Sequence, residues 1–205
     1  MIESEITVPI FPLNGALLLP NGNLPLNIFE ERYLDMVNYS LSKNKYIGMT
    51  QFQNQKDNIL YKTGCIGKIT NFIETEDNRY LINLFGIRKF DIIEEIKHDK
   101  KFRIFNVKVD NGYDLDNFNN HDFNRDSLLK KIMMYFDKNN ISIKIEELEA
   151  VENKQLIVTL SMICPFEVND KQMLLESKSV NELNDNLLAL LDFNNNKNDK
   201  SKTIN

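Results

Sequence analysis

The sequence has no tryptophan, only two cysteines and two histidines, and no apolar run long enough to cross a bilayer. A membrane-spanning helix needs about 20 consecutive apolar residues, whereas Pro, Asn and Gly interrupt the apolar opening between Gly15 and Phe29. Cys65 and Cys164 form no C-x-x-C pair and neither lies beside a histidine, so zinc and redox sites are not indicated. We therefore expect no metal ion, no other cofactor and no membrane partner.

Catalytic motifs are also missing, since G-x-S-x-G, H-E-x-x-H and the Rossmann glycine pattern do not occur. The nearest approach to a phosphate-binding loop is KTGCIGKIT, where Lys62 replaces the leading glycine and Ile69 replaces the Ser or Thr after Lys68. This segment is better interpreted as a strand whose glycines permit a bend. The sequence thus predicts a protein that is not an enzyme.

Acidic residues outnumber basic ones: the net charge is −5 and the isoelectric point is about 5.2. Nucleic-acid affinity rests largely on cationic contacts with phosphates, so this balance argues against such a partner. The one basic cluster, HDKKFR at residues 98–103, is interpreted as a solvated hairpin turn. His98 and His121 have no adjacent nucleophile or metal ligand in the sequence, so both are expected at the surface. The N-terminus lacks a secretory signal, which predicts a cytoplasmic location.

What the sequence does contain is a β-rich first half and a helical second half, divided by the polar stretch from Asp110 to Asn120. Segments rich in Ile, Val, Phe and Tyr fill residues 46–109, with short polar turns at residues 75–78 and 98–101. Such turns predict antiparallel hairpins whose strands pair in sequence order. Residues 80–85 are apolar on both faces, which is typical of a sheet that curls into a barrel and is partly covered outside.

Upstream of this region the sequence predicts two extended segments and one helix, with Leu24, Leu26 and Ile28 in the second extended segment. Residues 5–13 alternate as a strand does, and Pro9 and Pro12 indicate an edge position or an irregular path for it. In FEERYLDMVNYSLSK an apolar residue recurs every four positions, which predicts a helix with one buried face. That face comprises Phe29, Tyr33, Val37 and Leu41.

Three apolar stripes at helical spacing predict helices in the second half, which we expect to form a small bundle. The stripes comprise Leu128, Leu129, Ile132, Met133 and Phe136, then Leu156, Leu160 and Ile163, and finally Val180, Leu183, Leu187 and Leu191. Ser179 and Glu182 form a capping box. Asn169 is predicted to cap a further short helix, with Gln172 reaching back. The acidic segment IEELEAVE, residues 145–152, is predicted to be an amphipathic helix rather than a metal site.

Three segments carry a resemblance to a known family: PIFPL at residues 9–13, LPLNIFEERY at residues 24–33 and GIRKF at residues 86–90. From about Ile6 to Leu191, the chain looks like the LON substrate-binding domain, the N-terminal domain of ATP-dependent Lon proteases, in its standalone bacterial form. The resemblance implies an α+β fold, in which an N-terminal PUA-like β-barrel with one helix is followed by a C-terminal α-helical bundle.

The domain boundaries that follow from this fold are residues 1–112 for the PUA-like β subdomain and residues 113–193 for the helical subdomain. Residues 194–205 carry almost no apolar side chain and are expected to form a disordered polar tail.

The resemblance also implies a function, namely non-catalytic binding of protein or peptide, because in the family this domain contacts unfolded or tagged substrates. The ATPase and Ser-Lys protease modules of a full Lon protease have no counterpart in these residues. The implied partners are unfolded or extended polypeptide, a protease or chaperone that works with the chain, and a second copy in weak self-association. Nucleic acid and membrane are not among them.

The candidate peptide-binding residues are Phe29, Arg32, Tyr33 and Arg88. Large apolar residues are usually buried, so the two aromatic candidates also fit the core of the barrel and its helix, as do Phe11 and Leu13. Arg32 and Arg88 fit either a ligand contact or an ion pair with a carboxylate of the barrel, such as Glu30.

Two other functions stay open at this point. PUA-like barrels also occur in RNA-binding proteins, although the acidic balance of this chain argues against that role. A small-ligand-binding domain, with an apolar cleft between barrel and bundle, is the other alternative.

The charge balance makes the nucleic-acid alternative testable. At physiological salt we expect no detectable binding of a labelled RNA or DNA oligonucleotide, because the one basic turn is too small to neutralise several phosphates. Titration followed by fluorescence anisotropy measures this. Submicromolar affinity that is abolished by Lys100→Glu together with Lys101→Glu would instead establish the RNA-binding alternative.

Overall fold

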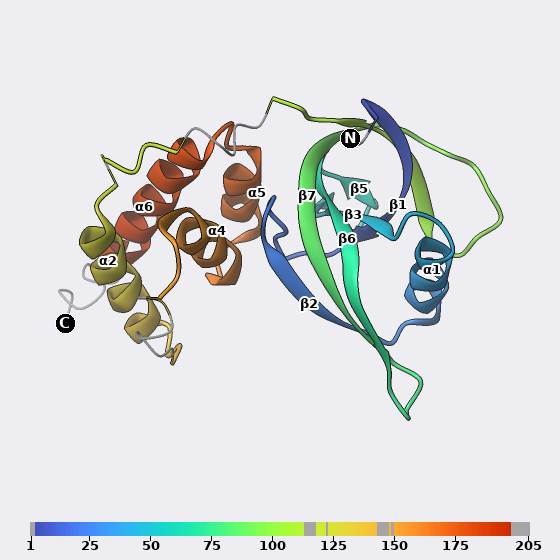
Figure 1. Cartoon of the computed structure of the whole chain (residues 1–205), viewed down its shortest axis with the longest axis horizontal. Helices are drawn as coiled ribbons and strands as arrows, with labels where there is room; N and C mark the ends of the chain where they lie inside the picture. Colours follow the sequence, from blue (N-terminus) through green and yellow to red (C-terminus); the bar gives the residue numbers. More distant parts are fainter. Residues whose placement is uncertain (1–2, 113–117, 122, 143–147, 149, 198–205) are drawn as a thin grey trace.

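The computed structural model describes residues 3–112, 118–121, 123–142, 148 and 150–197. Its strands are β1 (Glu5–Pro12), β2 (Asn23–Ile28), β3 (Tyr46–Thr50), β4 (Phe52–Asn54), β5 (Ile59–Leu60), β6 (Thr63–Glu74), β7 (Tyr80–Glu95) and β8 (Arg103–Val109). Its helices are α1 (Glu31–Leu41), α2 (Arg125–Lys138), α4 (Asn153–Ile163), α5 (Val168–Glu176) and α6 (Val180–Lys197). Figure 1 shows the strands and α1 on one side of the molecule and the remaining helices on the other.

The main sheet has six strands in the order β2-β7-β6-β3-β1-β8, and β8 also pairs with β7. The pairings therefore run from β1 through β3, β6, β7 and β8 back to β1, while β2 is attached to β7 outside this ring. Every pair is antiparallel except β1 with β3. Strands β4 and β5 form a separate small hairpin.

The predicted hairpin pairing is confirmed for β6 with β7 and for β7 with β8. Strand β2, for which the sequence predicted no partner, pairs with the distant β7. The predicted edge position of β1 is also wrong, because β8 pairs with residues 5–10 and β3 with residues 10–12. Pro9 precedes the pairing with β3, so its missing N–H lies where β1 has one neighbour only. Within the described residues the edge strand is β2, with Pro25 in its middle.

The predicted helices are confirmed as elements, and α2, α4 and α5 each pack against α6. Among the residues of the apolar stripes, the predicted buried position is wrong for Ile163, which lies at the end of α4 and is 46% exposed. The capping box is confirmed, since Ser179 Oγ accepts the Glu182 N–H and a Glu182 carboxylate oxygen accepts the Lys178 N–H.

Two predictions about helix ends need correction. Helix α5 begins two residues earlier than an Asn169 cap requires, with Glu167 at the N-cap position and Gln172 buried instead of reaching back. Helix α6 continues through Lys197, so residues 194–197 are helical rather than part of a disordered tail. Asn195 holds this last turn in place, because its amide donates to the Lys131 carbonyl of α2. Of the predicted acidic helix, residues 145–147 and 149 lie outside the described residues, Leu148 is helical and buried, and residues 150–152 are not helical.

The apolar run Leu17–Leu19 is almost completely buried between the sheet and the helices. On the sheet side it lies against Gly67 and Gly86, whose missing side chains leave room for Leu18 and for the Leu19 backbone. On the helix side, Lys171 of α5 donates a hydrogen bond to the Gly15 carbonyl, with Nζ and O 2.6 Å apart. This segment, which we call the leucine segment, therefore joins the two parts of the molecule.

Buried polar side chains connect the same two parts directly. The Gln51 amide donates to the Val168 carbonyl and to Gln172 Oε1, at 3.0 and 3.2 Å. Lys89 of β7 donates to the Ser177 carbonyl just after α5. Buried polar groups are costly unless they are hydrogen-bonded, so these bonds fix one arrangement of the helices on the sheet.

The close approach at Gly86 leads to a prediction about stability. A Cβ atom at this position would clash with the carbonyl oxygen of Leu19, which is backbone and is held by the buried leucine segment. We expect Gly86→Ala to lower the free energy of unfolding by about 2 kcal/mol or more, measured by urea denaturation. Gly112→Ala is the matched control, because there the new Cβ meets only the end of the Asp110 side chain. Equal stability of the two variants would contradict the packing described above.

The buried Lys89 leads to a prediction about pH. Burial lowers the pKa of Lys89 from its ordinary value of 10.5 to about 8, so near pH 9 the folded chain holds a neutral amine where the unfolded chain still binds a proton. Stability should therefore rise with pH between about 8 and 10.5, by about 3 kcal/mol in all. The measurement is the difference in free energy of unfolding between the native chain and Lys89→Met. A difference that stays flat over this range would show that Lys89 is not desolvated.

Candidate functional site

A groove with a volume of about 390 Å³ lies where β1 ends, where β2 leads into α1, and beside the β4–β5 hairpin. We call it the Phe29 groove. Its apolar lining comes from Phe11, Leu26, Ile28, Phe29, Tyr33 and Phe52. Its polar lining comes from Asn14, Asn27, Glu30, Arg32, Gln55 and Asn58. The volume is in the range of known ligand pockets, and a few polar groups set among apolar walls are typical of them.

Phe29 is the most exposed large apolar residue of the described chain, with 64% of its surface accessible. The core position predicted for it is therefore wrong. The reason is local: Ile28, the last residue of β2, is buried, and side chains alternate along extended backbone, so the next residue points outward. Helix α1 begins only at Glu31 and does not turn Phe29 inward. The Arg79 guanidinium lies 5.9 Å from the centre of the Phe29 ring and supports it by a cation–π contact.

Tyr33 and Phe11 form a rigid wall of the groove, as their predicted core positions require. Both are buried, and their ring centres lie 4.3 Å apart. Burial raises the pKa of the Tyr33 phenol and is the largest effect. The nearby Arg32 guanidinium lowers this pKa and the Glu30 carboxylate raises it, each to a smaller extent. The hydroxyl therefore keeps its proton at neutral pH. Among the described residues nothing forms a hydrogen bond with it, so it is available to a ligand.

Arg32 lies at the rim of the groove and is engaged with its neighbours. Its guanidinium contacts the Glu30 carboxylate at 2.8 and 3.0 Å and lies over the Tyr33 ring at 4.5 Å. Of the two predicted alternatives for Arg32, the ion pair with Glu30 is confirmed. Because this pair is internally neutral, the rim presents a polar but uncharged surface.

Arg88, the fourth candidate, lies apart from the other three. It is half-buried on β7 and lines a different, more open depression together with Glu3, Glu5 and Asn106. The structure thus brings Phe29, Arg32 and Tyr33 together in one groove and places Arg88 outside it.

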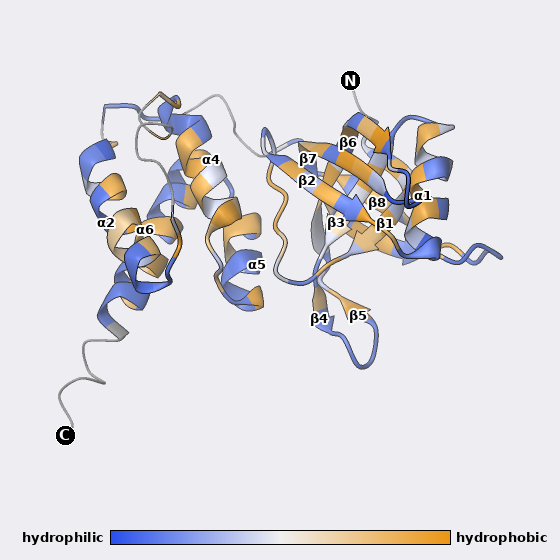
Figure 2. Cartoon of the chain, turned by 90° about the horizontal axis from the view of Figure 1, so that it is seen from below, coloured by the Kyte–Doolittle hydropathy of each residue, from blue (hydrophilic) through white to orange (hydrophobic). Residues whose placement is uncertain are grey.

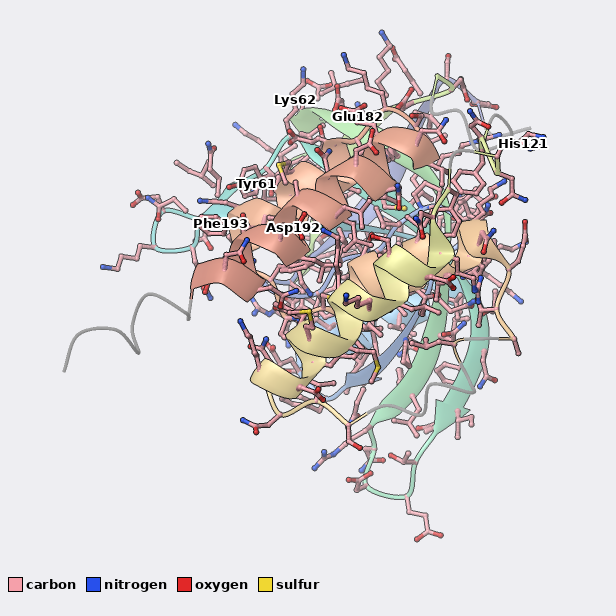
Figure 3. All side chains as sticks on the ribbon, turned by 90° about the vertical axis from the view of Figure 1, so that its left-hand side faces the viewer. Tyr61, Lys62, His121, Glu182, Asp192 and Phe193 are labelled. Carbon is pink, nitrogen blue, oxygen red and sulfur yellow. The ribbon has the colours of Figure 1, made fainter. Side chains whose placement is uncertain are left out.

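The remaining features noted in the sequence form no site. In the basic turn, Lys101 pairs with Glu31, Arg103 pairs with Glu95, and Lys100 lies over the Tyr39 ring. Both histidines are exposed, and Figure 3 shows His121 across the helical layer from Phe193 and Asp192. Lys68 is in strand β6, where a bulge at Gly67 confirms the predicted bend.

Metal and thiol chemistry find no support in the part of the chain that is described. No group of three or more His, Cys, Asp or Glu residues there is arranged to hold a metal ion. Both cysteines are buried, and burial raises the pKa of each thiol to about 12. A thiol with so high a pKa is a poor nucleophile at neutral pH.

Sequence reasoning missed the contributions of the loops to the groove. Asn14 reaches across to the β4–β5 hairpin, where its Oδ1 accepts the Phe52 N–H at 2.8 Å. Asn14 had a detectable signal as part of an Asn-Gly turn. The hairpin residues Phe52, Gln55 and Asn58 had none, because their place beside β1 depends on contacts far apart in the sequence.

The family of the ATP-dependent protease La (LON) substrate-binding domain matches residues 7–192. A Lon protease from Buchnera aphidicola is 25% identical over 202 residues, which cover 93% of this chain and 25% of the relative. A Lon protease from Dictyoglomus thermophilum is 22% identical over 183 residues, covering 85% and 23%. The chain thus spans about a quarter of the length of these curated relatives.

Solved structures show the same fold. A Lon N-terminal domain protein from Xanthomonas campestris superposes with a TM-score of 0.62 at 19% identity, covering 92% of this chain and 98% of its own. The N-terminal domain of a Mycobacterium avium complex Lon protease gives a TM-score of 0.61 at 12% identity, covering 94% and 100%. Over the described residues, no helix has both the length and the apolar character needed to span a bilayer.

Proposed function

The chain belongs to the family of the ATP-dependent protease La (LON) substrate-binding domain, and from this premise we propose that it binds unfolded or extended polypeptide through the Phe29 groove. The observation that carries the proposal is Phe29 itself, a phenylalanine left 64% exposed beside a wall of buried aromatic residues. An exposed apolar anchor on a rigid base is typical of a protein-binding surface.

The chemistry of the groove favours an apolar side chain of an extended chain over a charged small molecule. Glu30 and Arg32 neutralise each other at the rim, so no net charge attracts an ionic ligand. The Tyr33 hydroxyl and the side-chain amides of Asn14 and Gln55 are suited to the peptide groups of a bound segment. Extended peptides lose conformational entropy when they dock, so we expect affinities of about micromolar order.

We infer that binding is not followed by chemistry at this site. No Ser, Thr, Cys or His lines the groove, and its one carboxylate is held by an arginine. Because the relatives are Lon proteases, we propose that the bound polypeptide is destined for proteolysis, with this domain supplying recognition.

The fold inferred for this role is that of the family. We propose that the ring of strand pairings is the PUA-like β-barrel, with residues 1–112 as its subdomain. Helices α2, α4, α5 and α6 form the helical subdomain in residues 113–193, extended by the last turn of α6. A depression of about 790 Å³ also lies between the sheet and the end of α5, lined by Lys89, Asp91 and Glu176 among others. The exposed apolar side chain of Phe29 favours the Phe29 groove over it as the site for polypeptide.

The test compares two equally exposed phenylalanines. We expect Phe29→Ala to weaken binding of a permanently unfolded, reduced and alkylated model protein by about tenfold, because the apolar anchor is lost. Phe193→Ala is the matched control, since Phe193 on α6 is 61% exposed but lies far along the chain in the helical layer. Fluorescence anisotropy of the labelled model protein measures both. If the two variants bind as tightly as the native chain, the groove is not the binding site.

A further inference from the structure

The outer face of strands β2, β7 and β6 forms a regular surface next to the Phe29 groove. The strand register places Asn27, Leu81 and Ile73 in one row across the three strands, and Pro25, Asn83 and Asn71 in the next row. Residues paired in this way lie on the same face of the sheet. The opposite face carries the buried residues of β7, whereas Asn27, Leu81 and Ile73 are exposed. Figure 2 shows the three strands side by side. We call this surface the asparagine face.

The apolar members of this face are unusually exposed. Ile73 is 51% exposed and Leu81 is 41% exposed, and the two are direct cross-strand partners. Phe29 follows Asn27 by two residues, about 7 Å further along the same face, so its ring extends the apolar surface toward the groove. Ile73, Leu81 and Phe29 thus form one patch that is continuous with the proposed binding site.

The asparagines of this face offer hydrogen-bonding groups that match a peptide backbone. A side-chain amide carries both donors and an acceptor, as a peptide group does. Asn83 is already engaged, because its Nδ2 donates to Asn23 Oδ1 and to Thr70 Oγ1 at 3.0 and 2.9 Å. Asn27 and Asn71 are exposed, and among the described residues neither side chain forms a hydrogen bond.

The spacing of these two amides suits an extended chain. They are separated by two inter-strand steps of about 4.8 Å and by two residues along the strand, which gives about 12 Å between them. In an extended peptide, groups that point the same way recur about every 7 Å, so residues i and i+4 lie about 13 Å apart. One extended segment therefore reaches both amides while its side chains contact the apolar patch.

The charge at the end of the β6–β7 hairpin selects the kind of segment. Glu74, Glu76, Asp77 and Arg79 cluster there, and Asp77 pairs with Arg79 at 2.8 Å. Glu74 and Glu76 are exposed and have no ion-pair partner among the described residues. The surplus charge beside the apolar patch is negative.

We propose that the asparagine face binds extended polypeptide segments in which apolar residues are flanked by lysine or arginine, with Asn27 and Asn71 holding the main chain and Glu74 and Glu76 facing the basic flank. This rests on the proposed function and deepens it. Because the asparagines contact the backbone, recognition of the segment does not depend on its exact apolar sequence. The acidic flank then sets which unfolded segments are preferred.

The experiment uses the 205-residue chain and three synthetic peptides with the same alternating Leu-Ser centre. One peptide has two lysines at each end, the second has two glutamates at each end, and the third is the lysine peptide with N-methylated leucines. Anisotropy titrations at low salt should show the lysine peptide binding about fivefold more tightly than the glutamate peptide. N-methylation, which removes backbone donors but keeps the side chains, should weaken binding by about tenfold.

Three double variants, one of them a control, assign these effects. Glu74→Lys with Glu76→Lys should reverse the preference for the lysine peptide, whereas Glu3→Lys with Glu5→Lys, the same change of charge in the β1 region, should preserve it. Asn27→Ala with Asn71→Ala should weaken the lysine and glutamate peptides by the same factor and remove most of the effect of N-methylation. Raising the salt to about 0.5 M should abolish the lysine preference alone.

The outcomes separate this inference from the proposed function. In one outcome, binding of the unfolded model protein depends on Phe29, but the charge of the peptide ends, N-methylation and the double variants leave peptide affinity unchanged. Then the asparagine face is not used, although the function stands. If neither the model protein nor any peptide binds, both fail. If the asparagine variant instead changes the monomer–dimer equilibrium in sedimentation without affecting peptides, a second copy of the chain occupies the face and the inference is overturned.

Discussion

The arrangement of the molecule depends on burying the leucine segment between the sheet and the helices. Leu17, Leu18 and Leu19 are each at most 2% exposed, and about 1.5–3 kcal/mol is gained for each such side chain removed from water. The backbone of the segment is held from both sides, because the Asn21 N–H donates to the Gly86 carbonyl and Lys171 donates to the Gly15 carbonyl. The three leucines belong to the apolar cluster that includes buried residues of both the sheet and the helices.

This constraint also positions the Phe29 groove. The leucine segment leads directly into β2, so its burial fixes where β2 runs along β7 and where the chain enters α1. Ile28 and Tyr33 are buried at the two ends of that entry, and only the short turn between them faces outward. The exposure of Phe29 is thus a consequence of a rigid framework. An anchor held in this way loses little conformational freedom when a partner docks.

Local patterns in the sequence were sufficient for the helices and hairpins but not for the long-range pairings. The stripe of Leu128, Ile132 and Phe136 predicted α2 because helical periodicity is a local property. The pairing of β2 with β7 was missed because nothing near β2 specifies so distant a neighbour. For Phe29 the sequence predicted two alternatives, a ligand contact and a core residue. The backbone path after Ile28 exposes the side chain, and this path could not be read from the sequence. The asparagine face was missed for the same reason, since its members meet only through strand register.

Proline 25, in the middle of the outermost strand, has a consequence for how the protein handles what it binds. An open sheet edge invites a further strand to join and is a common starting point for aggregation. Under the proposed function, unfolded chains would bind at an apolar patch beside such an edge, where a joining strand could start aggregation. Pro25 has no N–H to offer a joining strand, so the edge of β2 cannot propagate a continuous ladder. The chain therefore places an exposed apolar face beside a sheet edge that cannot extend, so a polypeptide bound as proposed would not be built into the sheet.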